Sequence, residues 1–123
     1  MGKFTSPSAS AHQKALTLYH NAALTSTKVA VATSKRNLHG FIFENTNDVP
    51  VYVHFYDAAS DDVTVGSTTP TFSIPVPAGG YADRLSDMPI KEMGTALTIA
   101  CTTSKTGGSG TPSTSILAQL NYK

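Results

Sequence analysis

The chain has 123 residues, a formal net charge of +1, 14% charged residues, 40% hydrophobic residues and a single cysteine. This length fits one domain, and the charges form no basic stripe of the kind that nucleic-acid binding requires. No run of about 18 apolar residues is present, so a membrane-spanning helix is not expected.

The first residues differ in composition from the rest of the chain. Residues 1–14 are rich in Ser, Ala, Pro and Lys and show no sustained apolar period. Such a composition is typical of a segment that binds a partner rather than one that packs into a core. We therefore predict an extended N-terminal arm over residues 1–14, with Phe4 as its one large anchor, and a single folded domain over residues 15–123.

Strand signals dominate the remainder of the chain. Residues 15–24 are ambiguous, because their leucines suit a short strand and their paired alanines permit a helical turn. From residue 28 onward, runs of β-branched and aromatic residues predict strands within residues 28–33, 38–46, 49–58, 71–77, 80–86, 96–104 and 115–123. About seven short strands separated by Gly, Pro and Asn turns predict an all-β fold, either an antiparallel β-sandwich or a jelly-roll-like barrel.

The run FSIPVP contains two prolines within a strand pattern. Pro75 and Pro77 lie two positions apart, so both lack a backbone N–H on the same side of the strand. Missing donors on one side fit only a strand at the edge of a sheet. The apolar residues that alternate with these positions are expected to face the core: Phe72, Ile74 and Val76. The following Gly79-Gly80 pair allows the backbone to reverse with positive φ.

The strand at residues 51–56 has two different faces. Its apolar set is Val51, Val53 and Phe55, which we expect to face the core. Its amphipathic set is Tyr52, His54 and Tyr56, which we expect to face outward or into a subunit contact. Together with Phe4, this amphipathic set is the predicted partner interface.

Chemical motifs are sparse. Three carboxylates lie in the turn DAASDD, residues 57–62, but their spacing does not match a calcium loop, so a solvated acidic turn is the preferred interpretation. Cys101 lies in a strand pattern and is interpreted as a small core residue. The sequence lacks a G-x-S-x-G elbow and a phosphate loop, and we predict no catalytic residue, metal ligand or cofactor. A Ser-His-Asp site assembled in space stays an open alternative.

A longer pattern carries a resemblance to a group of proteins. VYVHFYDAASDDVTVGSTTPTFSIPVPAGG, residues 51–80, together with the later TALTIACTT and the terminal NYK, resembles small structural proteins of tailed bacteriophages. The resemblance covers roughly residues 38–123. It implies a virion protein with a β-sandwich or jelly-roll fold and no enzymatic activity, and it supplies no catalytic residues to carry over.

Within this group, the expected role is a capsid cement or decoration protein at the capsid surface. It would bridge neighbouring capsomers through the major capsid protein, with many weak copies acting together. A homo-oligomer is expected, with a trimer favoured by the symmetry of a shell. The alternatives are a neck, tail or fibre component of the virion, a glycan-binding β-sandwich module, and an unrecognised hydrolase.

Overall fold

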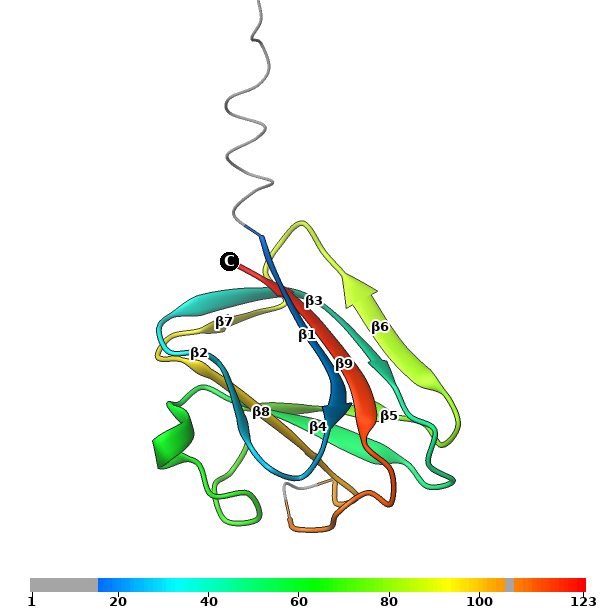
Figure 1. Ribbon diagram of the computed structural model, residues 1–123. Helices are drawn as coiled ribbons and strands as arrows, with labels where there is room; N and C mark the ends of the chain where they lie inside the picture. The colour runs from blue at the N-terminus through cyan, green and yellow to red at the C-terminus, as the bar shows by residue number, and fades with distance from the viewer. Residues whose placement is uncertain (1–15, 106–107) are drawn as a thin grey trace, which may run out of the picture.

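The computed structural model of the chain describes residues 16–105 and 108–123. Over these residues, nine strands form two antiparallel sheets that pack face to face (Figure 1). The fold is thus an all-β sandwich rather than a closed barrel, which confirms the predicted class and decides between its two forms. The predicted arm over residues 1–14, including Phe4, lies outside the described residues.

The two sheets, which we call sheet I and sheet II, draw their strands from distant parts of the chain. Sheet I has the order β1-β9-β3-β6, with β7 also paired to β3. Its strands are β1 (Thr17–Leu24), β3 (Arg36–Glu44), β6 (Tyr81–Leu85), β7 (Lys91–Met93) and β9 (Ile116–Tyr122). Sheet II has the order β2-β8-β4-β5, formed by β2 (Val29–Ala32), β8 (Leu97–Thr102), β4 (Val51–Tyr56) and β5 (Phe72–Val76). A 3-10 turn, η1 (Ser60–Asp62), lies between β4 and β5.

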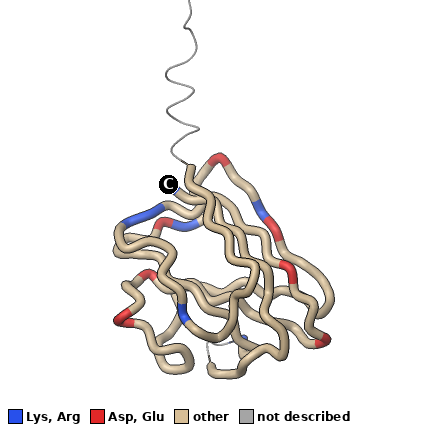
Figure 2. Tube along the Cα trace, in the orientation of Figure 1, with Lys and Arg blue, Asp and Glu red and all other residues tan. Residues whose placement is uncertain are grey.

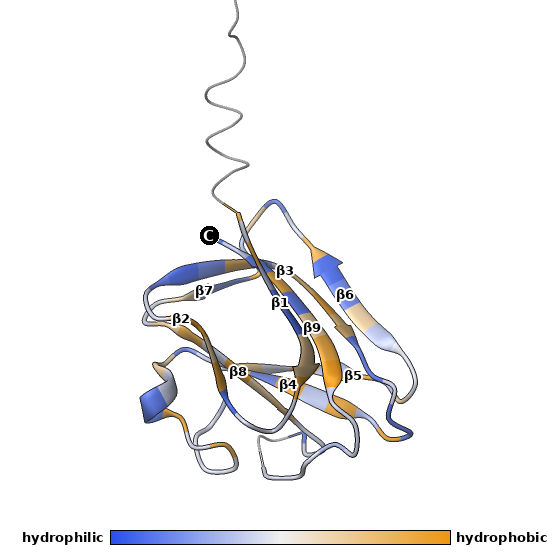
Figure 3. Cartoon of the chain, viewed as in Figure 1, coloured by the Kyte–Doolittle hydropathy of each residue, from blue (hydrophilic) through white to orange (hydrophobic). Residues whose placement is uncertain are grey.

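The core lies between the sheets and follows from strand alternation. In β9, Ile116, Ala118, Leu120 and Tyr122 are buried, whereas the residues between them are half-buried. Figure 3 shows apolar positions (orange) along the strands of both sheets. The predicted apolar set of β4 is 0% exposed, as is Cys101, so both expectations are confirmed. Burial raises the pKa of the Cys101 thiol to about 12, as expected of an inert core cysteine.

A β-bulge in β3 divides sheet I. The pairing of β3 with β9 shifts register between Leu38 and Gly40, and the extra residue is the buried His39. Before the bulge β3 pairs with β7, and after it with β6. The bulge reverses the alternation of side chains, so that Leu38 and Phe41 both contribute to the core. Sequence patterns predicted neither this bulge nor the three-residue strand β7.

Strand β5 is an edge strand, as its prolines predicted. It pairs with β4 alone, and Pro75 is exposed opposite Tyr52. Of its apolar residues Val76 is fully buried, while Phe72 and Ile74 are half-buried and pack against the core. After this strand Gly79 has a φ of +64°, which is the positive φ expected there. Within the ambiguous segment 15–24, Thr17–Leu24 form the strand β1.

Candidate interaction surface

The predicted outward face of β4 is covered by the chain itself. His54 is 0% exposed and Tyr56 is 1% exposed, so the expectation that they face outward is wrong, and only Tyr52 stays half-buried at the surface. Tyr56 is covered by the β4–β5 connection, which places Val63 against it in a second small apolar cluster, and His54 hydrogen-bonds to Ser73 and Thr102 on the neighbouring strands. Phe4, the fourth predicted interface residue, lies outside the described residues.

His54 links three strands of sheet II by hydrogen bonds. Thr102 Oγ1 donates to the Ser104 carbonyl over 3.0 Å, so it accepts from His54 Nε2, which lies 2.8 Å away. His54 Nδ1 is therefore the acceptor for the Ser73 hydroxyl, at 2.6 Å. Burial lowers the pKa of His54, although the nearby Ser104 backbone partly opposes this, and the imidazole is neutral at neutral pH.

Ser73 and His54 are arranged like the nucleophile and the base of a catalytic triad, but in the part of the chain that the structure describes no carboxylate completes the triad. The partner of His54 Nε2 is a threonine, and among the described residues no carboxylate hydrogen-bonds to the imidazole. Both ring nitrogens are satisfied within the domain. A hydrogen-bonded core histidine that joins β4, β5 and β8 accounts for all of these contacts.

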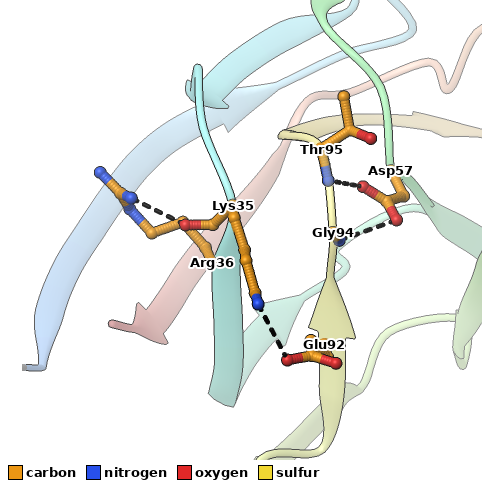
Figure 4. A network of polar contacts seen from close by, with 6 residues as sticks. All are labelled: Lys35, Arg36, Asp57, Glu92, Gly94 and Thr95. Atoms are coloured by element: carbon orange, nitrogen blue, oxygen red, sulfur yellow. Dashed lines mark hydrogen bonds and ion pairs between the residues drawn. The ribbon is translucent and has the colours of Figure 1, made fainter.

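The side chain of Asp57 anchors a distant loop instead of facing solvent. It accepts hydrogen bonds from the backbone N–H groups of Gly94 at 2.9 Å and Thr95 at 2.7 Å (Figure 4). A third comes from the backbone N–H of Ala96 at 3.3 Å. Partial burial alone would raise the pKa of Asp57, but these donors and the Lys91 charge outweigh it and lower the pKa. The predicted solvated turn is therefore correct for Asp61 and Asp62, which are exposed, and wrong for Asp57.

Other polar groups of the described residues serve the fold. The ion pair between Lys35 and Glu92, at 3.6 Å in Figure 4, is exposed on both sides and contributes little to stability. Residues 16–105 and 108–123 contain no group of three or more His, Cys, Asp or Glu that could hold a metal ion. In the same residues, no helix is long and apolar enough to cross a membrane.

A shallow groove opens on sheet II beside the His54 network. It has a volume of about 380 Å³ and is lined by Tyr52, Ser73, Pro75 and Lys105. An aromatic ring, a hydroxyl and an ammonium group around one groove are the types of group that bind sugars. The predicted interface residue Tyr52 therefore contributes to an open site.

Sheet I turns its other side, which we call the sheet I face, away from sheet II. Three rows of paired residues cross it: Leu18, Asn121, Gly40 and Leu85; then His20, Gln119, Ile42 and Asp83; then Leu117, Glu44 and Tyr81. Large apolar side chains on this face are exposed, with Leu18 at 64%, Ile42 at 45%, Tyr81 at 67% and Leu85 at 73%. An uncovered apolar face of this kind marks a contact with another chain or segment.

The charges around the sheet I face are unevenly distributed. Strands β1 and β9 carry no charged residue, and acidic positions lie along β6 and the end of β3 (Figure 2). Within the paired rows the charged side chains are Glu44 and Asp83, both exposed. Arg84 pairs with the core residue Phe41 and so alternates to the other side of β6, but it also lines a small pocket beside Ile42 and Leu85. The face therefore combines an apolar centre with an acidic side.

Comparisons with known proteins identify no relative. No protein-family model, curated protein sequence or solved structure matches the chain. Sequence reasoning also missed the sheet I face, although one signal was present: Leu18 and Leu85 occupy the strand positions that face away from the core, where polar residues are usual.

Proposed function

We propose that this chain is a non-enzymatic structural protein of a tailed-bacteriophage virion. Its role in the proposal is that of a capsid cement or decoration protein, which bridges neighbouring capsomers at the capsid surface. Its partners are the major capsid protein and further copies of itself, with a trimer favoured. A neck, tail or fibre component is the alternative position in the particle.

The observation that carries this proposal is the sheet I face. A domain of this size that exposes Leu18, Ile42 and Leu85 on one sheet is suited to contact with other chains rather than to a free monomeric life. The polar groups with the form of a catalytic site, His54 and Ser73, have their partners within the fold. The resemblance of residues 38–123 to small phage structural proteins supplies the biological setting.

Counting copies in purified particles tests this proposal. A copy number that matches the capsid lattice supports a cement protein, and one that matches the symmetry of the neck or tail supports the alternative position. The complete absence of the protein from virions would overturn both.

Binding to shells tests the surface itself. Leu85→Ala is expected to weaken binding of the purified chain to empty shells, because it removes an exposed apolar side chain from the sheet I face. Met88→Ala is the matched control, since Met88 is 72% exposed and Leu85 is 73% exposed, and Met88 lies in the loop after β6. Equal shell binding by the two variants would contradict the use of this face.

The groove beside Tyr52 favours a second function, a glycan-binding module on a fibre. In this case Tyr52 would stack on a sugar ring, Lys105 would donate a hydrogen bond to a sugar hydroxyl group, and the Ser73 oxygen would accept one. A glycan array separates the two functions: specific retention that is lost in Tyr52→Ala and kept in Leu85→Ala supports the module. No retention by the wild-type chain removes it.

A further inference from the structure

A small pocket lies beside Gly40 on the sheet I face. A Cβ at Gly40 would lie 2.9 Å from Leu85 Cδ1 and 3.0 Å from the Arg84 carbonyl oxygen, so a side chain has no room at this position. The pocket has a volume of about 70 Å³ and is lined by Phe41, Ile42, Arg84, Leu85, Gln119 and Asn121. Small-molecule sites are usually about 300–1,000 Å³, so this pocket is suited to the end of one large apolar side chain.

The charges of the sheet I face argue against a second copy of the same face as its occupant. Two such faces in contact would enclose the Glu44 and Asp83 carboxylates of both copies, and the paired rows contain no Lys or Arg to neutralise them, so this contact would be unfavourable. The occupant should instead be basic. Residues 1–15 contain Lys3 and Lys14 and no Asp or Glu, so this segment carries the complementary charge.

We propose that residues 1–15 of a second copy bind the sheet I face, with Phe4 in the pocket beside Gly40. Phe4 is the one aromatic residue of this segment. The inference rests on the oligomer of the proposed function and names the contact that would join its copies. It requires neither a capsid nor any other partner.

The length of the segment permits a contact with a second copy. The pocket lies on β3, two strands away from β1, which corresponds to about 10 Å across the sheet. The residues between Phe4 and Leu16 can span up to about 40 Å when extended. That length is sufficient to reach a neighbouring molecule as well as the same chain, and the cross-linking of a doubly substituted chain distinguishes the two.

Cross-linking between differently substituted chains tests this contact. A tagged full-length Phe4→Cys chain is mixed with an untagged Leu85→Cys chain and oxidised mildly, and the native Cys101 does not interfere because it is 0% exposed. We expect several-fold more of the tagged–untagged dimer than in a mixture of Phe4→Cys with Met88→Cys, whose substituted site is equally exposed. Equal yields in the two mixtures would overturn the proposal.

Two further measurements identify the occupant. A chain with both Phe4→Cys and Leu85→Cys is expected to form covalent oligomers, and a link confined to single chains would overturn the assignment to a second copy. Light scattering is expected to show an oligomer for the wild type and for Met88→Ala, and lower mass for Phe4→Ala and Leu85→Ala. A monomeric wild type at high micromolar concentration would overturn the proposal.

Failure of this inference leaves the proposed function separately testable. A chain that is monomeric in solution and still present in virions at a capsid-like copy number would remove the contact between copies and keep the structural role. A chain that forms the cross-link and is absent from virions would do the reverse.

Discussion

The outer faces of the two sheets differ in what covers them. On sheet II, the β4–β5 connection packs over Tyr56. The Ser104 carbonyl, which follows β8, accepts a hydrogen bond from Thr102, the partner of His54 Nε2. All six residues of β8 are buried. On sheet I, the equivalent side exposes Leu18, Ile42 and Leu85. One face is therefore completed within the chain, and the other is left for contact with another molecule.

This difference shows that the alternation of apolar and polar residues along a strand is not sufficient to locate an interface. The amphipathic residues of β4 alternate with a core set, yet His54 and Tyr56 are buried, Tyr56 in contact with residues of the long β4–β5 connection. On sheet I the exposed positions carry apolar residues in strands that alternate in the same way. We therefore expect different results when a large side chain is replaced by alanine on the two faces. On sheet II the substitution should lower stability, and on sheet I it should weaken association.

The largest effect is expected from truncation on the covered face. Tyr56→Ala should lower the free energy of unfolding by about 3–5 kcal/mol, because it removes a ring that is 1% exposed. Tyr56→Phe is the matched control and should be neutral or slightly stabilising, since the Tyr56 hydroxyl is buried without a hydrogen-bond partner. Urea unfolding measures both. A small loss for Tyr56→Ala would mean that this face is not covered in solution.

A smaller loss of stability is expected when Asp57, which holds the loop at residues 94–96, is truncated. Asp57→Ala should lower the free energy of unfolding by about 1–2 kcal/mol, because three backbone N–H groups lose their acceptor. Since the pKa of Asp57 is lowered in the folded state, this stabilisation is present above the ordinary carboxyl pKa and is lost as the pH falls through the lowered value. The exposed Asp48→Ala is the control, and an equal loss there would contradict the anchor.

The pH dependence of stability tests the neutral His54. Its pKa is lowered in the fold, so below the ordinary histidine pKa of about 6.5 the unfolded chain binds more protons than the folded chain. Stability should therefore be complete above that pH and decrease as the pH falls toward the lowered pKa. His54→Gln should be less stable but show a flatter dependence between neutral and mildly acidic pH. The exposed His20→Gln should keep the wild-type dependence, and a flat wild-type profile would contradict the assignment.

The smallest effect on stability is expected on the open face. Tyr81→Ala should change the free energy of unfolding of the isolated chain by no more than about 0.5 kcal/mol, because the side chain is 67% exposed. The comparison with Tyr56→Ala uses the same substitution on both sheets and the same urea titration. A loss comparable to that of Tyr56→Ala would show that the sheet I face is covered by the chain itself.

The strands and the sheet edge could be predicted from the sequence because their causes are local. Alternating apolar residues produced the β9 pattern, and the two prolines placed β5 at an edge before any pairing was known. Strand β7 was missed because three residues carry too little periodicity. The bulge at His39 was missed because it depends on which strands lie beside β3.

The candidate site was harder to predict because its causes are distant in the sequence. Asp57 bonds to a loop 37 to 39 residues away, and His54 bonds to Thr102 over 48 residues. Neither partner can be inferred from spacing. The apolar residues on the outer side of sheet I are exposed because no other segment of the described chain packs on them. Alternation within a single strand cannot predict whether another segment will do so.

The prolines of β5 have a consequence for crowded copies of the chain. Polypeptide aggregates often grow by adding identical strands to a free sheet edge, as cross-β fibrils do. Pro75 withholds a donor from any strand added to β5, and the opposite edge of sheet II, β2, has only four residues. Neither edge offers a long template, so molecules held at high local density are protected from fibril growth through this sheet.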